Sequence, residues 1–346
     1  MKRMIVLLLL AFPCFAFSQY ILKEGYISLE ANENVHRDFT FKNLRIYPLL
    51  GGNEFQAAYS DVGSFTNLQE ALENEKVIIS EKGGAVLQTA GYNNDELLDE
   101  NYSIQQMESR QATEQDGDVN ALYIENVSQD TVYLMAGEVV KGGKQDRVLA
   151  SDRVLPPGSG KVELPVFCVE HGRWNYLSSP AGFSEYFSVS SNSVRGKAVK
   201  EKNQYEVWEA VAEVTDKQGA KSGSGTYTAL QDAIDYTKSL EEYSNYFNQQ
   251  LKQLDDCIGF VGVTGDRIIG CDIFATPGLF AKQCDNLLDA YITEAISEGE
   301  ALSINDKDVF NYLNEFLSDE ASQEEVVRAK GMEFKHKGRK LHVNTY

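Results

Sequence analysis

The chain of 346 residues carries 32 Lys and Arg against 52 Asp and Glu, a formal net charge of −20 at pH 7. This acidity argues against nonspecific nucleic-acid binding, because each neutralised phosphate requires a Lys or Arg side chain. Hydrophobic residues make up 42% of the sequence and aromatic residues 11%, which excludes an intrinsically disordered chain. The length allows one or two domains with a sizeable core.

Residues 1–18 are typical of a secretory signal peptide. A basic start precedes an apolar run at 4–17, and Ala16 and Ser18 are the small residues before a cleavage site at Gln19. The apolar run is shorter than the ~20 residues that a membrane-spanning helix needs. We therefore expect an exported protein, periplasmic or extracellular, that is not inserted in a membrane after cleavage.

Export would place the cysteines of the mature chain in an oxidising compartment. These cysteines are Cys168, Cys257, Cys271 and Cys284. A hairpin predicted at 258–273 would place Cys271 opposite Phe260 and point Cys257 to the other face, which disfavours a bridge between the two cysteines. We expect most of these thiols to be free and buried, although the sequence does not decide their pairing.

The region after the signal peptide alternates short apolar runs with turn residues, which is typical of antiparallel strands. We expect strands at 39–41, 44–47, 55–59, 77–79, 85–87, 121–125, 131–135, 138–141, 144–149 and 161–167. A short helix is predicted within 64–75, where Leu68, Ala71 and Leu72 recur at helical spacing. The polar and acidic stretch 91–120 is expected to be a surface excursion.

Helical periodicity begins after residue 200. We expect helices around 207–214, 227–255, 277–295 and 306–318, with the hairpin 258–273 between the second and the third. Thr276 followed by Pro277 is a standard helix start. The basic C-terminal tail is expected to be solvated, or to form an edge strand through 340–343.

These elements predict an α+β fold in which an antiparallel, β-rich and sandwich-like N-terminal half packs against amphipathic C-terminal helices and one hairpin. We expect a signal peptide at 1–18, then a single domain at 19–300, followed by a C-terminal helix and basic tail at 301–346. Within the domain, 36–170 would be β-rich and 203–298 helical.

The first candidate functional motif runs from Glu138 to Arg147. If Gly142-Gly143 forms a two-residue hairpin loop, Glu138 lies opposite Arg147, and both share a face with Gln145. One interpretation is a structural cross-strand ion pair. The other is a cleft in which Gln145 and Arg147 present donors to an anion, since the guanidinium fork suits phosphate or carboxylate.

The second motif runs from Cys168 to Trp174. Arg173 could add an anion contact and Trp174 a flat stacking surface, or the Arg could simply stack on a core Trp. Cys168 and His171 have C-x-x-H spacing, but no second ligand pair accompanies them, so we do not expect a metal. The same two residues would point to opposite faces of a strand, which disfavours a nucleophile–base pair.

Four stretches of the chain resemble the ADP-ribosylglycohydrolase- and rhodanese-phosphatase-associated domain family. They lie at 68–81, 121–147, 154–174 and 258–295, and the GE…GGKQDR and CVEHGRW motifs are specific together. The resemblance spans roughly residues 36–298. The family is functionally uncharacterised, and its name records an association with other enzymes rather than a mechanism.

The resemblance implies a shared polar pocket. Its residues would be Glu138, Lys144, Gln145, Arg147, Glu170, Arg173 and Trp174. The chain departs from the family pattern at Asp146, where Asn is common, so Asp146 is not expected to be an obligatory base.

Three functions are compatible with these motifs, and the cofactor and the oligomeric state stay open. The first is a binding module for a small anionic ligand, such as a nucleotide or a sugar phosphate. The second is a hydrolase of an ADP-ribose-like or phosphorylated substrate, with Glu138 or Glu170 as general base. The third is a structural or interaction protein of the cell envelope. The sequence contains no G-x-S-x-G elbow, phosphate-binding loop or dinucleotide fingerprint.

Overall fold

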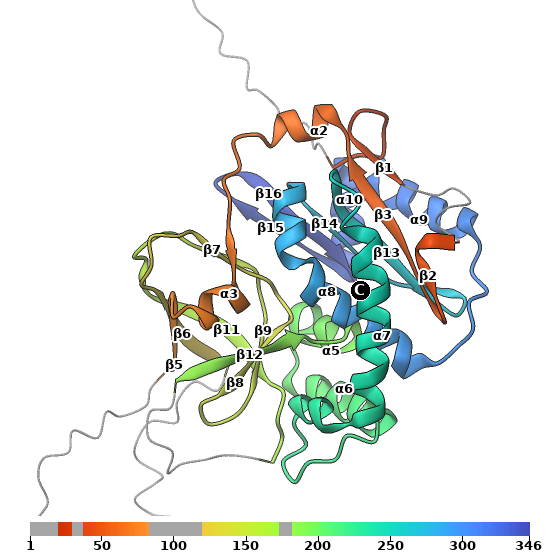
Figure 1. Ribbon diagram of the computed structural model, residues 1–346. Coiled ribbons are helices and arrows are strands. Elements are labelled where there is room, and N and C mark those ends of the chain that lie inside the picture. Colours follow the sequence, from red (N-terminus) through yellow and green to blue (C-terminus); the bar gives the residue numbers. More distant parts are fainter. Residues whose placement is uncertain (1–19, 30–36, 83–119, 173–181) are drawn as a thin grey trace, which may run out of the picture.

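The computed structural model describes residues 20–29, 37–82, 120–172 and 182–346 (Figure 1). The predicted signal peptide, the predicted strand at 85–87, nearly all of the stretch 91–120, and Arg173 and Trp174 lie outside these described residues. Within them, no helix combines the length and apolar character needed to cross a bilayer.

The larger sheet is antiparallel and joins the two ends of the described chain. Its strand order is β1-β3-β13-β14-β16-β15, and β2 pairs with β3 at its side. The strands are β1 Ile27–Leu29, β2 Thr40–Phe41, β3 Leu44–Gly51, β13 Cys257–Thr264, β14 Arg267–Phe274, β15 Gly331–His336 and β16 Arg339–Thr345.

Six further strands form a closed barrel in the order β11-β6-β5-β12-β8-β9. They are β5 Val77–Glu81, β6 Ala121–Asn126, β8 Glu138–Gly142, β9 Arg147–Leu149, β11 Gly160–Cys168 and β12 Phe183–Val189. A small sheet of β10 Arg153–Leu155, β7 Val132–Leu134 and β4 Thr66–Asn67 accompanies the barrel. The α+β class with a β-rich N-terminal half is confirmed. The strands that we expected to be sandwich-like close on themselves, because Phe183 of β12 pairs with Ile79 of β5.

Helices cover the larger sheet on both faces (Figure 1). Tyr291 of α8 reaches Asp272, and Tyr312 of α9 interacts with the neighbouring Cys271. Adjacent strand residues point to opposite faces, so α8 and α9 lie on opposite sides of β14. The α-helices are α2 Asn53–Ala58, α3 Leu68–Glu73, α5 Asn192–Arg195, α6 Gln204–Lys217, α7 Ile234–Leu251, α8 Pro277–Glu298, α9 Asp306–Leu317 and α10 Glu320–Lys330. A π-helical segment, Gly196–Glu201, follows α5, and a 3-10 segment, Tyr227–Asp232, precedes α7.

The predicted strand at 55–59 is wrong, because residues 55–58 lie in helix α2 and Tyr59 is its C-cap. Gln56, Ala57 and Ala58 are good helix formers. The helix also stacks the Phe55 and Tyr59 rings one turn apart, with centroids 4.9 Å apart. The local alternation of apolar residues therefore did not decide the structure.

The hairpin at 258–273 forms as predicted, but its two strands pair in a different register from the predicted one. A bulge between Gly262 and Val263 places Cys271 opposite Val261 rather than Phe260. The argument from strand faces against a Cys257–Cys271 bridge therefore fails. All four cysteines expected in the mature chain are nevertheless free and buried.

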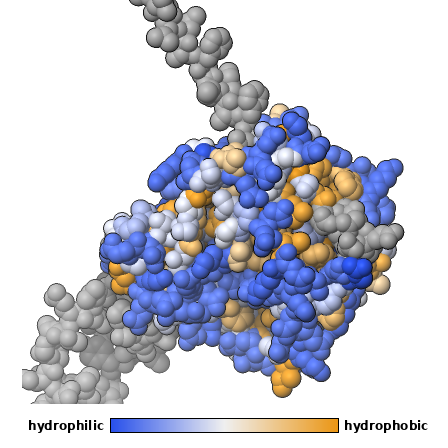
Figure 2. Space-filling model, turned by 45° about the horizontal axis from the view of Figure 1, so that its top comes forward, coloured by the Kyte–Doolittle hydropathy of each residue, from blue (hydrophilic) through white to orange (hydrophobic). Residues whose placement is uncertain are grey.

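The C-terminal tail is part of the core rather than a solvated segment. Strand β16 lies between β14 and β15, so it is an interior strand and not an edge. Leu341, His342 and Val343 are all buried. On the face shown in Figure 2, hydrophilic residues cover most of the surface, and hydrophobic residues gather in smaller areas.

The start of α8 gives a test of local stability. Thr276 Oγ1 accepts a hydrogen bond of 3.0 Å from the Leu279 backbone N–H. We expect Thr276→Ala to lower the free energy of unfolding by about 1 kcal/mol, because the N-cap acceptor is lost. Thr276→Ser keeps the hydroxyl and is the control. Equal stabilities of the two variants in urea denaturation would contradict the capping role.

Candidate functional site

The loop between β8 and β9 lies at the end of the barrel where β5 and β8 finish. Val140 pairs with Arg147, so the predicted pairing of Glu138 with Arg147 is wrong. The connection is longer than two residues because Asp146 leaves the ladder. Its Oδ1 accepts from the Gly142 N–H at 3.2 Å, which closes the loop on itself.

Asp146 also anchors this loop to the segment before α7. Its Oδ2 accepts from the hydroxyls of Thr226 and Thr228, both at 2.8 Å. The Asp146 backbone N–H donates to Glu170 Oε2 at 3.2 Å. The carboxylate therefore receives donors and holds the loop, a role that fits its almost complete burial.

Gln145 and Glu170 form the second connection of the barrel end. Gln145 Nε2 donates to the Glu170 carbonyl at 2.8 Å, and both side chains are buried. Lys144 is half-buried, and its backbone N–H donates to Glu81 Oε1 at 2.8 Å. Three of the residues predicted from the sequence, Lys144, Gln145 and Glu170, are thus brought together here with Arg147.

Arg147 is the residue of this end whose polar groups are least satisfied. Its side chain is fully buried, and Nη1 donates to the Gln145 carbonyl at 2.7 Å. Nη2 lies 3.7 Å from Glu81 Oε1, an ion pair without a hydrogen bond. Among the described residues, neither Nε nor Nη2 has a hydrogen-bond partner. Arg147 shares a strand face with Leu149, which belongs to the apolar cluster that fills the barrel.

Cys168 and His171 do not form a nucleophile–base pair. Burial raises the pKa of the Cys168 thiol, so the thiolate is disfavoured at neutral pH. The His171 ring packs edge-on against Trp208, with centroids 4.7 Å apart.

Glu138 lies elsewhere, at the start of β8 and away from the Arg147 loop. Its Oε2 accepts from the Met135 N–H at 2.7 Å, and the side chain is fully buried. Burial raises the pKa of Glu138 to about 8, with a further contribution from the charge of Asp152, while the Met135 hydrogen bond opposes the rise. Glu138 is therefore protonated at neutral pH, and the structure does not bring it together with Glu170.

A buried polar network that the sequence analysis did not predict joins the barrel to the larger sheet. His342 Nδ1 lies 2.7 Å from Asp152 Oδ2, and its Nε2 lies 2.9 Å from Asp272 Oδ1. Arg195 Nη2 donates to Asp272 Oδ1 at 2.9 Å, and Tyr291 donates to Asp272 Oδ2 at 2.5 Å.

The barrel side of this network is equally well connected. Asp152 Oδ1 accepts from the Ala136 N–H at 2.8 Å, and Asp152 Oδ2 accepts from the Tyr133 hydroxyl. The Phe274 ring stacks on His342, with centroids 4.3 Å apart and planes 4° apart. A lone Asp and a lone His within apolar strand sequences are the signals that could have pointed to this network.

The electrostatics of the network favour ionised groups. Burial alone would lower the pKa of His342, but the two aspartates outweigh it and raise the pKa to about 9. Burial alone would raise the pKa of Asp272, but Arg195 and His342 hold it well below its usual range. The network therefore matches two basic groups, Arg195 and His342, with two carboxyl groups, Asp152 and Asp272.

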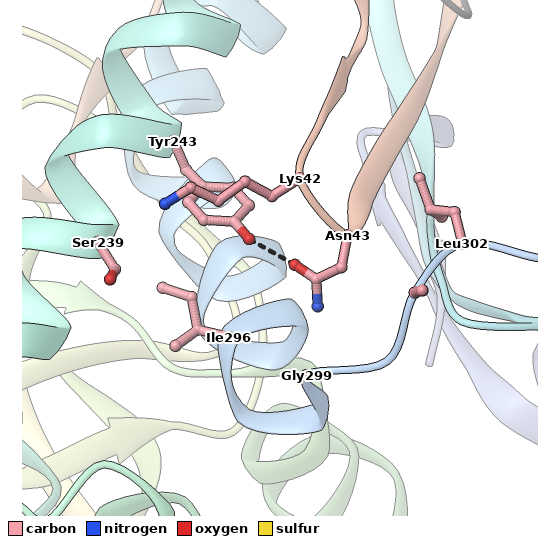
Figure 3. Close-up of a pocket in the computed structure, with 8 residues that line it drawn as sticks. Lys42, Asn43, Ser239, Tyr243, Ile296, Gly299 and Leu302 are labelled. Atoms are coloured by element: carbon pink, nitrogen blue, oxygen red, sulfur yellow. Dashed lines mark hydrogen bonds between the residues drawn. The ribbon is translucent and has the colours of Figure 1, made fainter.

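A hollow of about 490 Å³ lies between the β2–β3 turn, α7 and the end of α8 (Figure 3). Its polar groups already contact one another. Tyr243 donates to Asn43, Asn43 donates to the Ala295 carbonyl at 2.7 Å, and Lys42 pairs with Glu242 at 2.7 Å. The hollow therefore offers fewer spare donors than the barrel end.

Together these features define a class of α+β protein in which a closed barrel carries a buried polar cluster at one end and is fastened to a helix-covered antiparallel sheet. The chain belongs to the ARG and Rhodanese-Phosphatase-superfamily-associated Protein domain family, which matches residues 33–344. The match extends beyond the motifs found in the sequence and includes nearly all of β15 and β16. None of the curated proteins and none of the solved structures compared with the chain matches it.

The titration of His342 gives a testable pH dependence. Its folded pKa of about 9 lies above the unfolded value of about 6.5, so its stabilising effect is complete below pH 6.5 and is lost as the pH rises through 9. We expect the free energy of unfolding to fall in this window, and His342→Gln to make the slope shallower by up to ~1.4 kcal/mol per pH unit.

Denaturant titrations at several pH values measure these slopes. Glu138 also makes the free energy of unfolding fall as the pH rises, since burial raises its pKa to about 8. Glu138→Gln is therefore the parallel variant. Identical slopes for the wild type and His342→Gln would show that His342 is not held as a cation.

Proposed function

We propose that this protein is a binding module for a small anionic ligand, such as a nucleotide or a sugar phosphate, and that Arg147 at the barrel end is its principal contact. The supporting observation is a contrast between two fully buried arginines. Arg195 faces a built-in carboxylate, Asp272, with hydrogen bonds from both Nη atoms. Arg147 has a carboxylate at 3.7 Å and donates from Nη1 to a backbone carbonyl. Among the described residues, both its Nε and its Nη2 lack hydrogen-bond partners, whereas Arg195 lacks one only at Nε.

An incompletely paired guanidinium in a buried position is costly, because its desolvation is not offset. An oxyanion would complete the pairing, since the planar donor fork of Arg matches phosphate and carboxylate oxygens. Lys144 and Gln145 lie on the loop that carries Arg147, so they are placed to border such a ligand. Arg173 and Trp174 follow Gly172 in the sequence and stay predicted contacts.

The remaining predictions complete the proposal. The signal-peptide pattern at 1–18 supports export of the protein. The net charge of −20 supports selection of a small anion over a polyanion. In the hydrolase alternative Glu170 would act as general base, since Glu138 lies at a different place and is protonated. The envelope-scaffold alternative requires Arg147 to be a purely structural brace.

A thermal-shift screen of nucleotides, ADP-ribose and sugar phosphates tests the proposal. A ligand at 100 times its Kd should add about 2.7 kcal/mol to the free energy of unfolding. In Arg147→Met, which keeps a long apolar side chain, we expect this gain to disappear while the unliganded stability changes by no more than about 1–2 kcal/mol.

Arg195→Met is the matched control. It removes one of the two cations that face the buried Asp272, so we expect it to cost about 3–5 kcal/mol. If Arg147→Met is destabilised as strongly as Arg195→Met, Arg147 is a brace and the scaffold alternative holds. Turnover of a bound ligand that Glu170→Gln abolishes would instead support the hydrolase.

A further inference from the structure

A second cavity, of about 330 Å³, lies on the sheet side of the molecule. Its walls come from the π-helical segment Gly196–Glu201, from β14 around Ile268, and from Lys330 at the end of α10. Its volume is at the lower end of the roughly 300–1,000 Å³ that is typical of small-molecule sites. None of the residues that line it belongs to the barrel end.

Basic side chains outnumber acidic ones on the wall of this cavity. The chain as a whole has 32 Lys and Arg against 52 Asp and Glu, so the local balance is the reverse of the global one. The charged lining residues are Lys197, Lys200, Arg267, Lys330, Glu201 and Glu294.

Two of these cations already have carboxylate partners. Lys197 pairs with Glu206 at 2.7 Å, and Arg267 pairs with Glu298 at 3.0 Å. Arg267 also lies 3.6 Å from Glu294, which supplies one of the two acidic groups of the wall.

The other two cations are Lys200 and Lys330. Within the described part of the chain, no carboxylate lies within 4.0 Å of either ammonium group. Lys200 donates to the Arg328 carbonyl, and Lys330 lies 4.9 Å from the Tyr312 ring centroid. Two ammonium groups that lack a counter-ion among the described residues therefore border one cavity.

The backbone that presents Lys200 is itself unusual. A π-helix is rare and is frequently found at functional sites. Here it spans Gly196–Glu201 and ends at Lys202, whose φ of 52° is left-handed and unfavourable for a side chain other than Gly. Such strained segments persist where the position of their side chains matters.

An aromatic and an amide side chain complete the cavity. The Tyr346 ring lines it and also lies 5.2 Å from the Arg195 guanidinium. Asn192 lines it too, and its Oδ1 accepts from Arg195 Nη1 at 3.0 Å. A molecule bound here would therefore touch two direct neighbours of the buried network.

We propose that this cavity binds a small phosphate monoester, with Lys200 and Lys330 contacting the phosphate and Tyr346 contacting the rest of the molecule. Two ammonium groups match the double negative charge of a phosphate monoester, and an aromatic ring offers a flat apolar surface beside them. The site is separate from Arg147, so its occupation does not depend on the barrel end.

Calorimetric titration of the full chain with AMP, adenosine and inorganic phosphate tests this site. We expect Lys200→Gln/Lys330→Gln to weaken AMP binding at least tenfold, and adenosine to bind at least tenfold more weakly than AMP. Lys330 is exposed and Lys200 half-buried, so the variant should fold. Its melting temperature checks this.

Two controls separate this site from the barrel end. Lys221→Gln/Lys307→Gln removes the same charge from two exposed lysines and should leave AMP binding unchanged. Arg147→Met should also leave binding at the Lys200 site unchanged. The inference is overturned if AMP does not bind at millimolar concentration, if both lysine double variants weaken it equally, or if only Arg147→Met weakens it.

Discussion

The His342 imidazole contacts Asp152, which follows barrel strand β9, and Asp272, in the middle of the larger sheet. Arg195, at the end of helix α5 just before the π-helical segment, donates to the same Asp272. Three parts of the chain that are distant in sequence thus meet through buried charges that cancel one another. Because an unpaired buried charge costs several kcal/mol, the barrel, the helices and the sheet are each constrained by the position of the others.

The cost of an unpaired buried charge also distinguishes the two buried arginines, Arg195 and Arg147. Both Nη atoms of Arg195 donate to groups that the fold itself supplies, and among the described residues only its Nε lacks a hydrogen-bond partner. Arg147, at the far end of β9, lacks partners there for both Nε and Nη2. A protein keeps a poorly paired buried charge where function requires it, and a small anion is the chemical group that would satisfy it. If Arg147 binds an anion, the net charge of −20 would favour a small anion over a polyanion.

Local signals predicted much of the fold. The Thr276-Pro277 start of α8, the turn at Gly265 and the periodicity of α6 depend on neighbours in sequence, and all three were found. Barrel closure depends on the distant pair Ile79 and Phe183, and the β8–β9 register depends on Asp146 binding Thr226 and Thr228. The periodicity of apolar residues does not reveal which distant residues pair with one another. The motifs predicted the grouping of Gln145, Arg147 and Glu170, but they did not reveal that Glu138 lies apart from them, where the charge of Asp152 raises its pKa further.

The central claim is that His342 and Asp152 hold the barrel and the sheet together through a direct charge interaction. A double-mutant cycle of Asp152→Asn and His342→Gln, measured by denaturant unfolding at pH 7, tests it most directly. We predict that the double variant is more stable than the sum of the single effects implies, with a coupling of at least about 1 kcal/mol. Additivity within about 0.5 kcal/mol would contradict the account.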